Sequence, residues 1–292
     1  MDTKRTKLRQ RLASGPIIVA PGIYDAYGAR LVEQSGFEAA YMTGNGVSAA
    51  VLGQPDVGMV DLTLLSRHAH HAASAIGIPL ICDADTGYGN AVNVRHTVRE
   101  FEAAGVAAIH IEDQVSPKRC GHLPGARPVV ELPEAVGKIE AAVAARRDPD
   151  FVIIARTDAA SGHGLGGAIE RVRAFHEAGA DVLFVELKTS ATILDDLKRV
   201  TESVEAPFLV NIDGGGRLGE LTVPEIERLG FRIAIYPGLE RYAAGYAVRE
   251  ALVALKRDGT TNAVRDRMLT MQQYNDVLGL SGIEDWERRY LR

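Results

Sequence analysis

The sequence predicts an α/β fold, a single (β/α)8 (TIM) barrel over residues 1–292, and three observations support this prediction. Eight short apolar runs rich in β-branched residues alternate with longer segments of helical period. The runs are continuously apolar, as is typical of parallel strands covered on both faces. No proline-rich or low-complexity linker interrupts the series. The predicted strands are Pro16–Ala20, Glu38–Thr43, Ile78–Asp83, Ala107–Glu112, Phe151–Arg156, Asp181–Glu186, Pro207–Asn211 and Arg232–Tyr236.

Amphipathic segments rich in Ala and Leu separate these strands, and several end at a glycine, as helix C-termini commonly do. A doubly wound open sheet is the alternative fold, because periodicity does not tell whether the eighth strand pairs with the first. The glycine fingerprint that usually follows the first strand of such a sheet is missing, which favours the barrel. The clearest predicted helices are Asn93–Ala104, Glu134–Arg147, Ala168–Ala178 and Val223–Leu229.

Residues 239–292 form a long extension after the last predicted strand. Leu239–Arg257 has helical period, and a further 35 residues follow it, although a barrel needs only one helix there. Apolar side chains in the extension require a covering surface, so we expect a helical segment that mediates oligomerisation. These side chains include Met268, Leu269, Met271, Tyr274, Val277 and Leu278.

Composition excludes several classes of protein. The chain has 33 Lys and Arg against 38 Asp and Glu, a net charge of 33 − 38 = −5, which argues against a nucleic-acid partner. No apolar run approaches the roughly 20 residues that span a bilayer, and Met1–Leu12 lacks the apolar part of a signal peptide. The two cysteines do not form a disulfide framework. We therefore expect a cytoplasmic protein without a membrane partner.

Polar residues gather at the ends of the predicted strands, where barrel active sites are built. The intervals from Thr43 to Asp85 and from Glu112 to Arg156 are 42 and 44 residues, so extra loop follows strands two and four. Polar strand ends can simply meet solvent, but that reading is improbable for the whole set. The set is Tyr41, Thr43, Asp83, Asp85, Glu112, Asp113, Arg156, Asp158, Glu186, Asn211 and Asp213.

Three of these acids predict a metal site. Asp83, Asp85 and Glu112 follow neighbouring strands, and converging carboxylates repel one another unless a cation neutralises them. Oxygen ligands without His or Cys favour Mg²⁺, with Mn²⁺ as a substitute. A Schiff base on Lys188 is an alternative to the metal. The His68, His70 and His71 cluster is interpreted as a solvated helix face.

Cys120 lies in the insertion after strand four, between Lys118, Arg119 and His122. Cationic neighbours lower the pKa of a thiol, so this group is predicted to exchange protons near neutral pH. Prolines and glycines on either side suit a lid. The alternative is a surface loop with a chance cysteine. Arg156, at the end of strand five, either balances the acids or binds a substrate carboxylate.

Three motifs, Asp83–Gly89, Ile111–Gln114 and Lys118–His122, resemble the isocitrate lyase and phosphoenolpyruvate mutase superfamily. The Lys118–His122 loop looks like the lyase branch, most like the short 2-methylisocitrate and 2,3-dimethylmalate lyase groups. The resemblance implies helix exchange within a homotetramer or homodimer. It also implies an outer metal-site role for Asp56 and substrate contacts for Thr43, Gly44, Asn45, Lys118, Arg119, Gly121, Arg156, Glu186 and Asn211.

These observations together predict a Mg²⁺-dependent lyase that cleaves a 2-hydroxy di- or tricarboxylate into a 2-oxo acid and a second carboxylic acid. Catalysis is expected from Cys120 as proton donor, from Arg156 and His122, and from Tyr41 as a candidate base. The segments 123–127 and 213–218 depart from the superfamily pattern, so the substrate stays open. The alternatives are a phosphonomutase or an oxaloacetate decarboxylase or hydrolase, and a carboxylate-binding barrel without catalysis.

Overall fold

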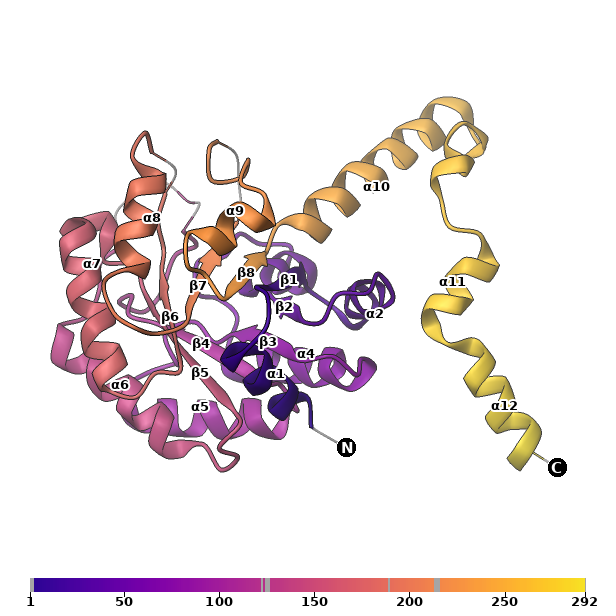
Figure 1. The fold of residues 1–292 in the computed structure, drawn as a ribbon. Helices are drawn as coiled ribbons and strands as arrows, with labels where there is room; N and C mark the ends of the chain where they lie inside the picture. The colour runs from indigo at the N-terminus through magenta and orange to yellow at the C-terminus, as the bar shows by residue number, and fades with distance from the viewer. Residues whose placement is uncertain (1–2, 122, 124–126, 189, 213–215, 292) are drawn as a thin grey trace.

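The computed structural model describes residues 3–121, 123, 127–188, 190–212 and 216–291. Within these residues, eight parallel strands form a closed barrel in the order β1 to β8, with helices around it (Figure 1). No helix of the described chain is long and apolar enough to cross a membrane. The strands are β1 (Ile18–Ile23), β2 (Ala40–Met42), β3 (Leu80–Asp83), β4 (Ala108–Glu112), β5 (Val152–Thr157), β6 (Val182–Val185), β7 (Phe208–Asn211) and β8 (Ile233–Tyr236).

Pairing between β1 and β8 closes the sheet. Ile18 lies opposite Ile233 and Pro21 opposite Tyr236, so the barrel prediction is confirmed and the open sheet is excluded. The first strand lies later than the predicted Pro16–Ala20, because β1 continues to Ile23. Gly22 permits this continuation, since a Cβ there would lie 2.5 Å from the Cα of Pro237.

The helices form the outer layer, and apolar side chains between helices and strands make the larger core. Phe101, Phe151 and Phe175 are among its largest fully buried members. The helices are α1 (Lys4–Ala13), α2 (Ala26–Gln34), α3 (Gly44–Val47), α4 (Leu62–Ala75), α5 (Ala91–Ala103), α6 (Leu132–Ala145), α7 (Ala160–Glu177), α8 (Ile193–Thr201), α9 (Val223–Arg228), α10 (Leu239–Asp258), α11 (Met271–Leu278) and α12 (Leu280–Tyr290), with short helices η1 (Ser48–Leu52) and η2 (Asn262–Arg267).

Helix α1 is an element that the sequence did not predict. Its only buried residues are Leu8 and Leu12, which join the inner core cluster with strand residues such as Ile18 and Ile233. Polar contacts from the helix add to this packing: Arg5 pairs with Asp148 at 3.0 Å and Arg9 with Asp181 at 2.7 Å, for example. A helix with two buried apolar residues gives a weak periodic signal, which explains the omission.

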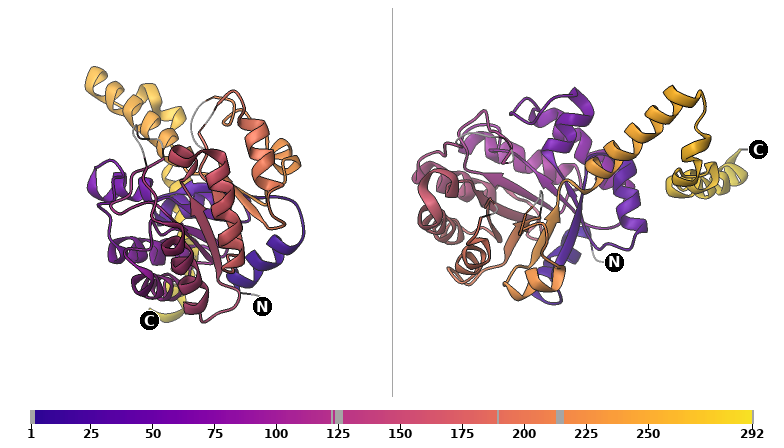
Figure 2. Two further views of the ribbon diagram at one scale, coloured as in Figure 1. Left: turned by 90° about the vertical axis from the view of Figure 1, so that its left-hand side faces the viewer. Right: turned by 90° about the horizontal axis from the view of Figure 1, so that it is seen from above.

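The C-terminal extension, α10 to α12, leaves the barrel as an arm (Figures 1 and 2). Helix α10 points away from the strands, and the chain then returns so that α11 lies beside α2, where the rings of Tyr27 and Tyr274 are 5.7 Å apart. Of the apolar side chains of the extension that we expected to need a covering surface, Val277 is buried and the others named above are exposed. Exposed apolar residues of the arm include Tyr242, Tyr246, Leu252, Val253, Met268, Met271, Ile283, Trp286 and Tyr290.

Glu240, at the base of the arm, generates a prediction about pH. Its carboxylate accepts a hydrogen bond from the Tyr24 N–H at 3.2 Å, and burial, together with the charge of Asp25, raises its pKa to about 7. The folded chain therefore binds more protons here than the unfolded chain, and stability is lost as pH rises from about 4.5 to 7.

We expect Glu240→Gln to gain stability relative to the unaltered chain as pH rises through this window. Urea titrations at several pH values measure the difference in free energy of unfolding between the two chains. Glu250→Gln, further along α10, is the control. The difference in free energy of unfolding between this variant and the unaltered chain should not change with pH. A difference for Glu240→Gln that stays constant with pH would contradict the prediction.

Candidate active site

An open cavity of about 400 Å³ lies at the carboxyl ends of the barrel strands. Most of the predicted site residues line it, so the structure brings them together. Gly44 and Asp85 lie directly behind this lining, and His122 and Asp213 fall outside the described residues. The lining residues are Tyr41, Thr43, Asn45, Asp56, Asp83, Glu112, Lys118, Arg119, Cys120, Gly121, Arg156, Glu186, Asn211, Pro237 and Arg241.

Strand register places the charged side chains side by side. Asp83 is the last residue of β3 and pairs with His110 of β4, while Glu112 ends β4 and pairs with Arg156 of β5. Residues two apart on a strand face the same side. His110 and Glu112 therefore both face the barrel interior.

Asp85 has an unusual backbone conformation. Its φ of 47° lies in the left-handed region, which few residues other than glycine adopt and which Asp tolerates better than most. The Glu112 N–H donates to the Asp85 carbonyl at 2.9 Å and holds this turn against β4. Such conformations cluster at functional sites, so Asp85 is a candidate for a role beyond packing.

The carboxylates of Asp56 and Asp85 share one buried ammonium. Lys118 Nζ lies 2.6 Å from Asp56 Oδ2 and 2.7 Å from Asp85 Oδ1. Burial and the charges of Asp83 and Asp56 raise the pKa of Asp85 despite this ion pair. Burial likewise raises the pKa of Glu112 well above its usual value. The acids around Lys118 therefore outnumber the positive charges that could neutralise them.

The acids at the strand ends have the donor atoms that a divalent ion requires. The side chains of Asp83, Asp85 and Glu112 offer only oxygen donors, which Mg²⁺ and Mn²⁺ prefer. Glu112 Oε1 is buried and makes no hydrogen bond within the described chain. The donor chemistry fits. Among the described residues, however, no three His, Cys, Asp or Glu side chains are gathered closely enough to form a preformed cage, and the Lys118 ammonium lies against Asp85.

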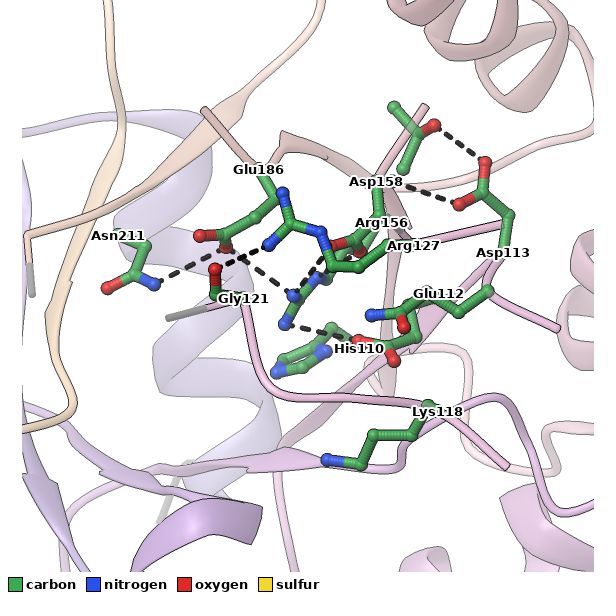
Figure 3. Close-up of polar contacts among 12 residues, drawn as sticks. His110, Glu112, Asp113, Lys118, Gly121, Arg127, Arg156, Asp158, Glu186 and Asn211 are labelled. Carbon is green, nitrogen blue, oxygen red and sulfur yellow. Dashed lines mark hydrogen bonds and ion pairs between the residues drawn. The ribbon is translucent and has the colours of Figure 1, made fainter. Parts of the chain in front are cut away.

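Arg156 is the centre of a second charged cluster (Figure 3). Its guanidinium makes two hydrogen bonds to Asp158, at 2.9 and 3.1 Å. It also lies 3.2 Å from Glu112 and 3.5 Å from Glu186, and its Cζ is 5.0 Å from the centre of the Phe184 ring. One cation thus faces three carboxylates, and the strand ends are oriented around it.

Tyr41 and His110 form a buried neutral pair. Tyr41 Oη lies 2.7 Å from His110 Nε2, and burial lowers the pKa of His110 to about 4. Burial also raises the pKa of Tyr41 well above its usual value. Both groups are therefore uncharged at neutral pH, and Tyr41 is a poor candidate for a base.

The Cys120 loop is held by hydrogen bonds around the thiol. Asn45 Nδ2 lies 3.0 Å from Cys120 Sγ, and the Cys120 N–H donates to the Asp56 carbonyl at 3.1 Å. The Gln114 side chain makes two hydrogen bonds to the Arg119 backbone, at 3.0 and 3.1 Å. The ammonium of Lys118 points to the acids, which differs from its expected role beside the thiol.

The Thr43–Asn45 segment is already engaged by the protein. The Gly44 N–H donates to Asp83 Oδ2 at 3.2 Å, so this expected substrate donor serves a carboxylate. A Cβ at Gly44 would lie 2.8 Å from that oxygen, which accounts for glycine there.

Comparison with known proteins places this chain in a family. A family model described as phosphoenolpyruvate phosphomutase matches residues 8–256. The chain belongs to the phosphoenolpyruvate phosphomutase family. It is 47% identical to 2,3-dimethylmalate lyase of Eubacterium barkeri over 97% of each chain. It is 41% identical to 2-methylisocitrate lyase of Shewanella oneidensis, covering 96% of this chain and 94% of that one.

Solved structures of the superfamily agree with this assignment. A crystal structure of 2,3-dimethylmalate lyase, a member of the PEP mutase/isocitrate lyase superfamily, has a TM-score of 0.91 and 39% identity, covering 99% of this chain and 96% of that chain. Phosphonopyruvate hydrolase in complex with oxalate and Mg²⁺ also has a TM-score of 0.91, at 33% identity over the full length of both chains.

Several residues at the site of this family member were missed or differ from expectation. His110 interrupts the apolar run of β4, and a lone polar residue in such a run is a local signal that could have indicated a site residue. Pro237 lines the cavity just before the arm and Arg241 lines it from the first turn of α10, and neither was among the predicted site residues. Lys188 is exposed and outside the cavity lining, which disfavours the Schiff base. His70 and His71 are exposed and His68 is half-buried on α4, as a helix face requires.

Proposed function

We propose that this chain is a carbon–carbon lyase that cleaves a 2-hydroxy di- or tricarboxylate, of the 2,3-dimethylmalate or 2-methylisocitrate kind, into a 2-oxo acid such as pyruvate and a second carboxylic acid such as succinate. The observation that carries the proposal is the thiol of Cys120, held 3.0 Å from Asn45 Nδ2 in the same cavity as Arg156 and the acids. Near full-length similarity to two lyases supports it.

We propose Mg²⁺ as the cofactor, with Mn²⁺ as a substitute. When bound, the ion would supply positive charge to the hydroxyl and carboxylate oxygens of the substrate. The oxygen-only donors and the unpartnered Glu112 Oε1 support this assignment, as does the Mg²⁺ complex of a solved relative. The residues that would hold the ion are Asp83, Asp85, Glu112 and Asp56.

The chain's own groups would carry the proton and the charge. The hydroxyl group gives its proton to a base and becomes the carbonyl of the 2-oxo acid as the bond between its carbon and the neighbouring carbon breaks. The electron pair of that bond remains on the neighbouring carbon, which carries the carboxylate of the second product. We assign Arg156 to binding that carboxylate, and the thiol of Cys120 to giving this carbon a proton. Tyr41 keeps its own proton, because burial raises its pKa, and so we assign it to hydrogen bonding.

A hydrolase or mutase on the same scaffold is the second candidate. The full-length similarity to phosphonopyruvate hydrolase favours it. Those reactions do not require a thiol acid, however, so the position of Cys120 favours the lyase. A barrel that binds a carboxylate without turnover is disfavoured by the buried charges assembled at the strand ends.

The proposed reaction and its metal can be tested with the purified chain. The purified chain, incubated with 2,3-dimethylmalate, 2-methylisocitrate, oxaloacetate and phosphonopyruvate, should release a 2-oxo acid from one of the first two, as measured by coupled reduction of that product. A chelator should abolish release, and Mg²⁺ or Mn²⁺ should restore it, since the acids need a counter-charge. Turnover of oxaloacetate or phosphonopyruvate alone would favour the second candidate, and turnover that survives chelation would contradict the metal assignment.

Cys120→Ser should retain substrate binding and lose turnover by about 10²-fold or more, because a hydroxyl is a much weaker acid than a thiol. Binding is measured by calorimetry and turnover by the assay above. Cys82→Ser is the matched control, since that thiol is buried in β3 and should leave turnover unchanged. Near-normal turnover of Cys120→Ser would remove the thiol from the mechanism.

We further propose that the arm, residues 239–292, exchanges with a second copy of the chain in a homodimer or homotetramer. Exposed apolar side chains support this: Tyr246, Leu252 and Trp286 are 57%, 60% and 64% exposed. Such a run of apolar surface is unusual for a chain that stays monomeric. An interface built on it would be large, apolar and obligate.

Light scattering should accordingly report a mass well above the 31.4 kDa of one chain. Removal of residues 258–292 should cause aggregation or unfolding. The milder variant Trp286→Lys should shift the mass towards smaller species, and Arg288→Lys, on the same helix, should not. An active monomer at micromolar concentration would refute the exchange.

A further inference from the structure

A second buried guanidinium lies beside the site, and the proposed mechanism does not use it. Arg127 follows the Cys120 loop, and its side chain is only 2% exposed. Its Nε lies 3.3 Å from Asp158 Oδ1, and its Nη1 donates to the Gly121 carbonyl at 2.8 Å (Figure 3). Burying a long cationic side chain is unfavourable unless it is paired, so these two contacts define its place.

Asp158 links the guanidinium of Arg127 to that of Arg156, which we assign to substrate binding. The same Oδ1 that faces Arg127 also accepts from Arg156 Nη2 at 3.1 Å, and Oδ2 accepts from Arg156 Nε at 2.9 Å. Asp158 is fully buried. One carboxylate thus lies between two arginines, and each of its oxygens is engaged.

Gly121 allows the Cys120 loop to lie against the side chain of Arg127. It directly follows Cys120, and a Cβ at this position would lie 2.7 Å from Arg127 Nη1 and 2.9 Å from Glu186 Oε1. Glycine therefore permits the loop backbone to approach both side chains. The Arg127 hydrogen bond then holds the carbonyl of the residue that directly follows Cys120.

We propose that Arg127 is a positioning residue that sets the Cys120 thiol against the carbon to be protonated. The guanidinium bridges the Gly121 carbonyl and Asp158, and thereby ties the loop that carries the proton donor to the arginine that binds the carboxylate. This role rests on the proposed lyase function for its catalytic consequence, whereas the restraint on the loop does not depend on it. Proton transfer is sensitive to such placement, because donor and acceptor must be within hydrogen-bond reach.

The bridge requires an arginine. The planar guanidinium spreads its charge over three nitrogens, so Nη1 can donate to the Gly121 carbonyl while the Nε side forms an ion pair with Asp158. A lysine offers one point charge at the end of a flexible stem. The contacts of Arg156 with Asp158, Glu112 and Glu186 are made without Arg127, so we expect them to remain when Arg127 is removed. Loss of Arg127 should therefore affect proton transfer much more than substrate binding.

The test compares Arg127→Met, Arg127→Lys and Arg171→Met. Arg171 is the matched control, because it is also buried and paired with an acid, Asp113, at 3.2 Å, and its polar contacts within the described chain are to Asp113 and the Val130 carbonyl and not to the Cys120 loop. Arg127→Met should lower kcat by about 10-fold or more, as expected for a misplaced acid, and change KM by less than about threefold. Arg127→Lys should recover part of kcat, and Arg171→Met should lower stability without this effect.

A second readout follows the loop directly in the resting protein. Cys120 should react with iodoacetamide several-fold faster in Arg127→Met than in the unaltered chain or in Arg171→Met. Removing a positive charge alone would disfavour the thiolate and slow the reaction, so faster labelling reports release of the loop. Cys82 is buried in β3 and serves as the internal reference.

The two readouts separate this inference from the lyase proposal. Labelling that accelerates only in Arg127→Met, in a chain without lyase turnover, would uphold the restraint and refute the reaction. Unchanged labelling in Arg127→Met, or equal losses of kcat in Arg127→Met and Arg171→Met, would overturn the positioning role.

Discussion

The site depends on the burial of more negative than positive charge at the carboxyl ends of the strands. Arg156 faces Asp158, Glu112 and Glu186, and Lys118 faces Asp56 and Asp85. Each cation is buried, and each would leave several uncompensated carboxylates if it were removed. The positions of the strand ends and of the loop depend on how these charges are shared.

The sequence predicted the barrel and most of the cavity, because both leave local signals. Eight apolar runs report eight buried strands, and an acid or arginine after an apolar run reports a strand end. Side chains such as Glu112 and Arg156 could therefore be assigned to one face before their neighbours were known. The motif around Cys120 added the loop, which periodicity alone does not predict.

Other features depend on contacts between distant parts of the chain, and these leave little local signal. Helix α1 has only two buried apolar residues, so its packing under the barrel is visible only in three dimensions. The Lys118 ammonium was expected beside the thiol, but Asp56 and Asp85 bind it instead. Arg241 lines the cavity and Arg127 is buried beside it, and only the fold brings these two arginines there.

Closure of the barrel also bears on how the protein folds. β1 and β8 lie near opposite ends of the barrel sequence, so their pairing carries one of the largest entropic costs of loop closure in the chain. Pro237 and Arg241 complete the cavity wall directly after β8. The cavity is therefore complete only when the last strand has paired with the first, although Cys120, Arg156 and the acids come from earlier parts of the chain.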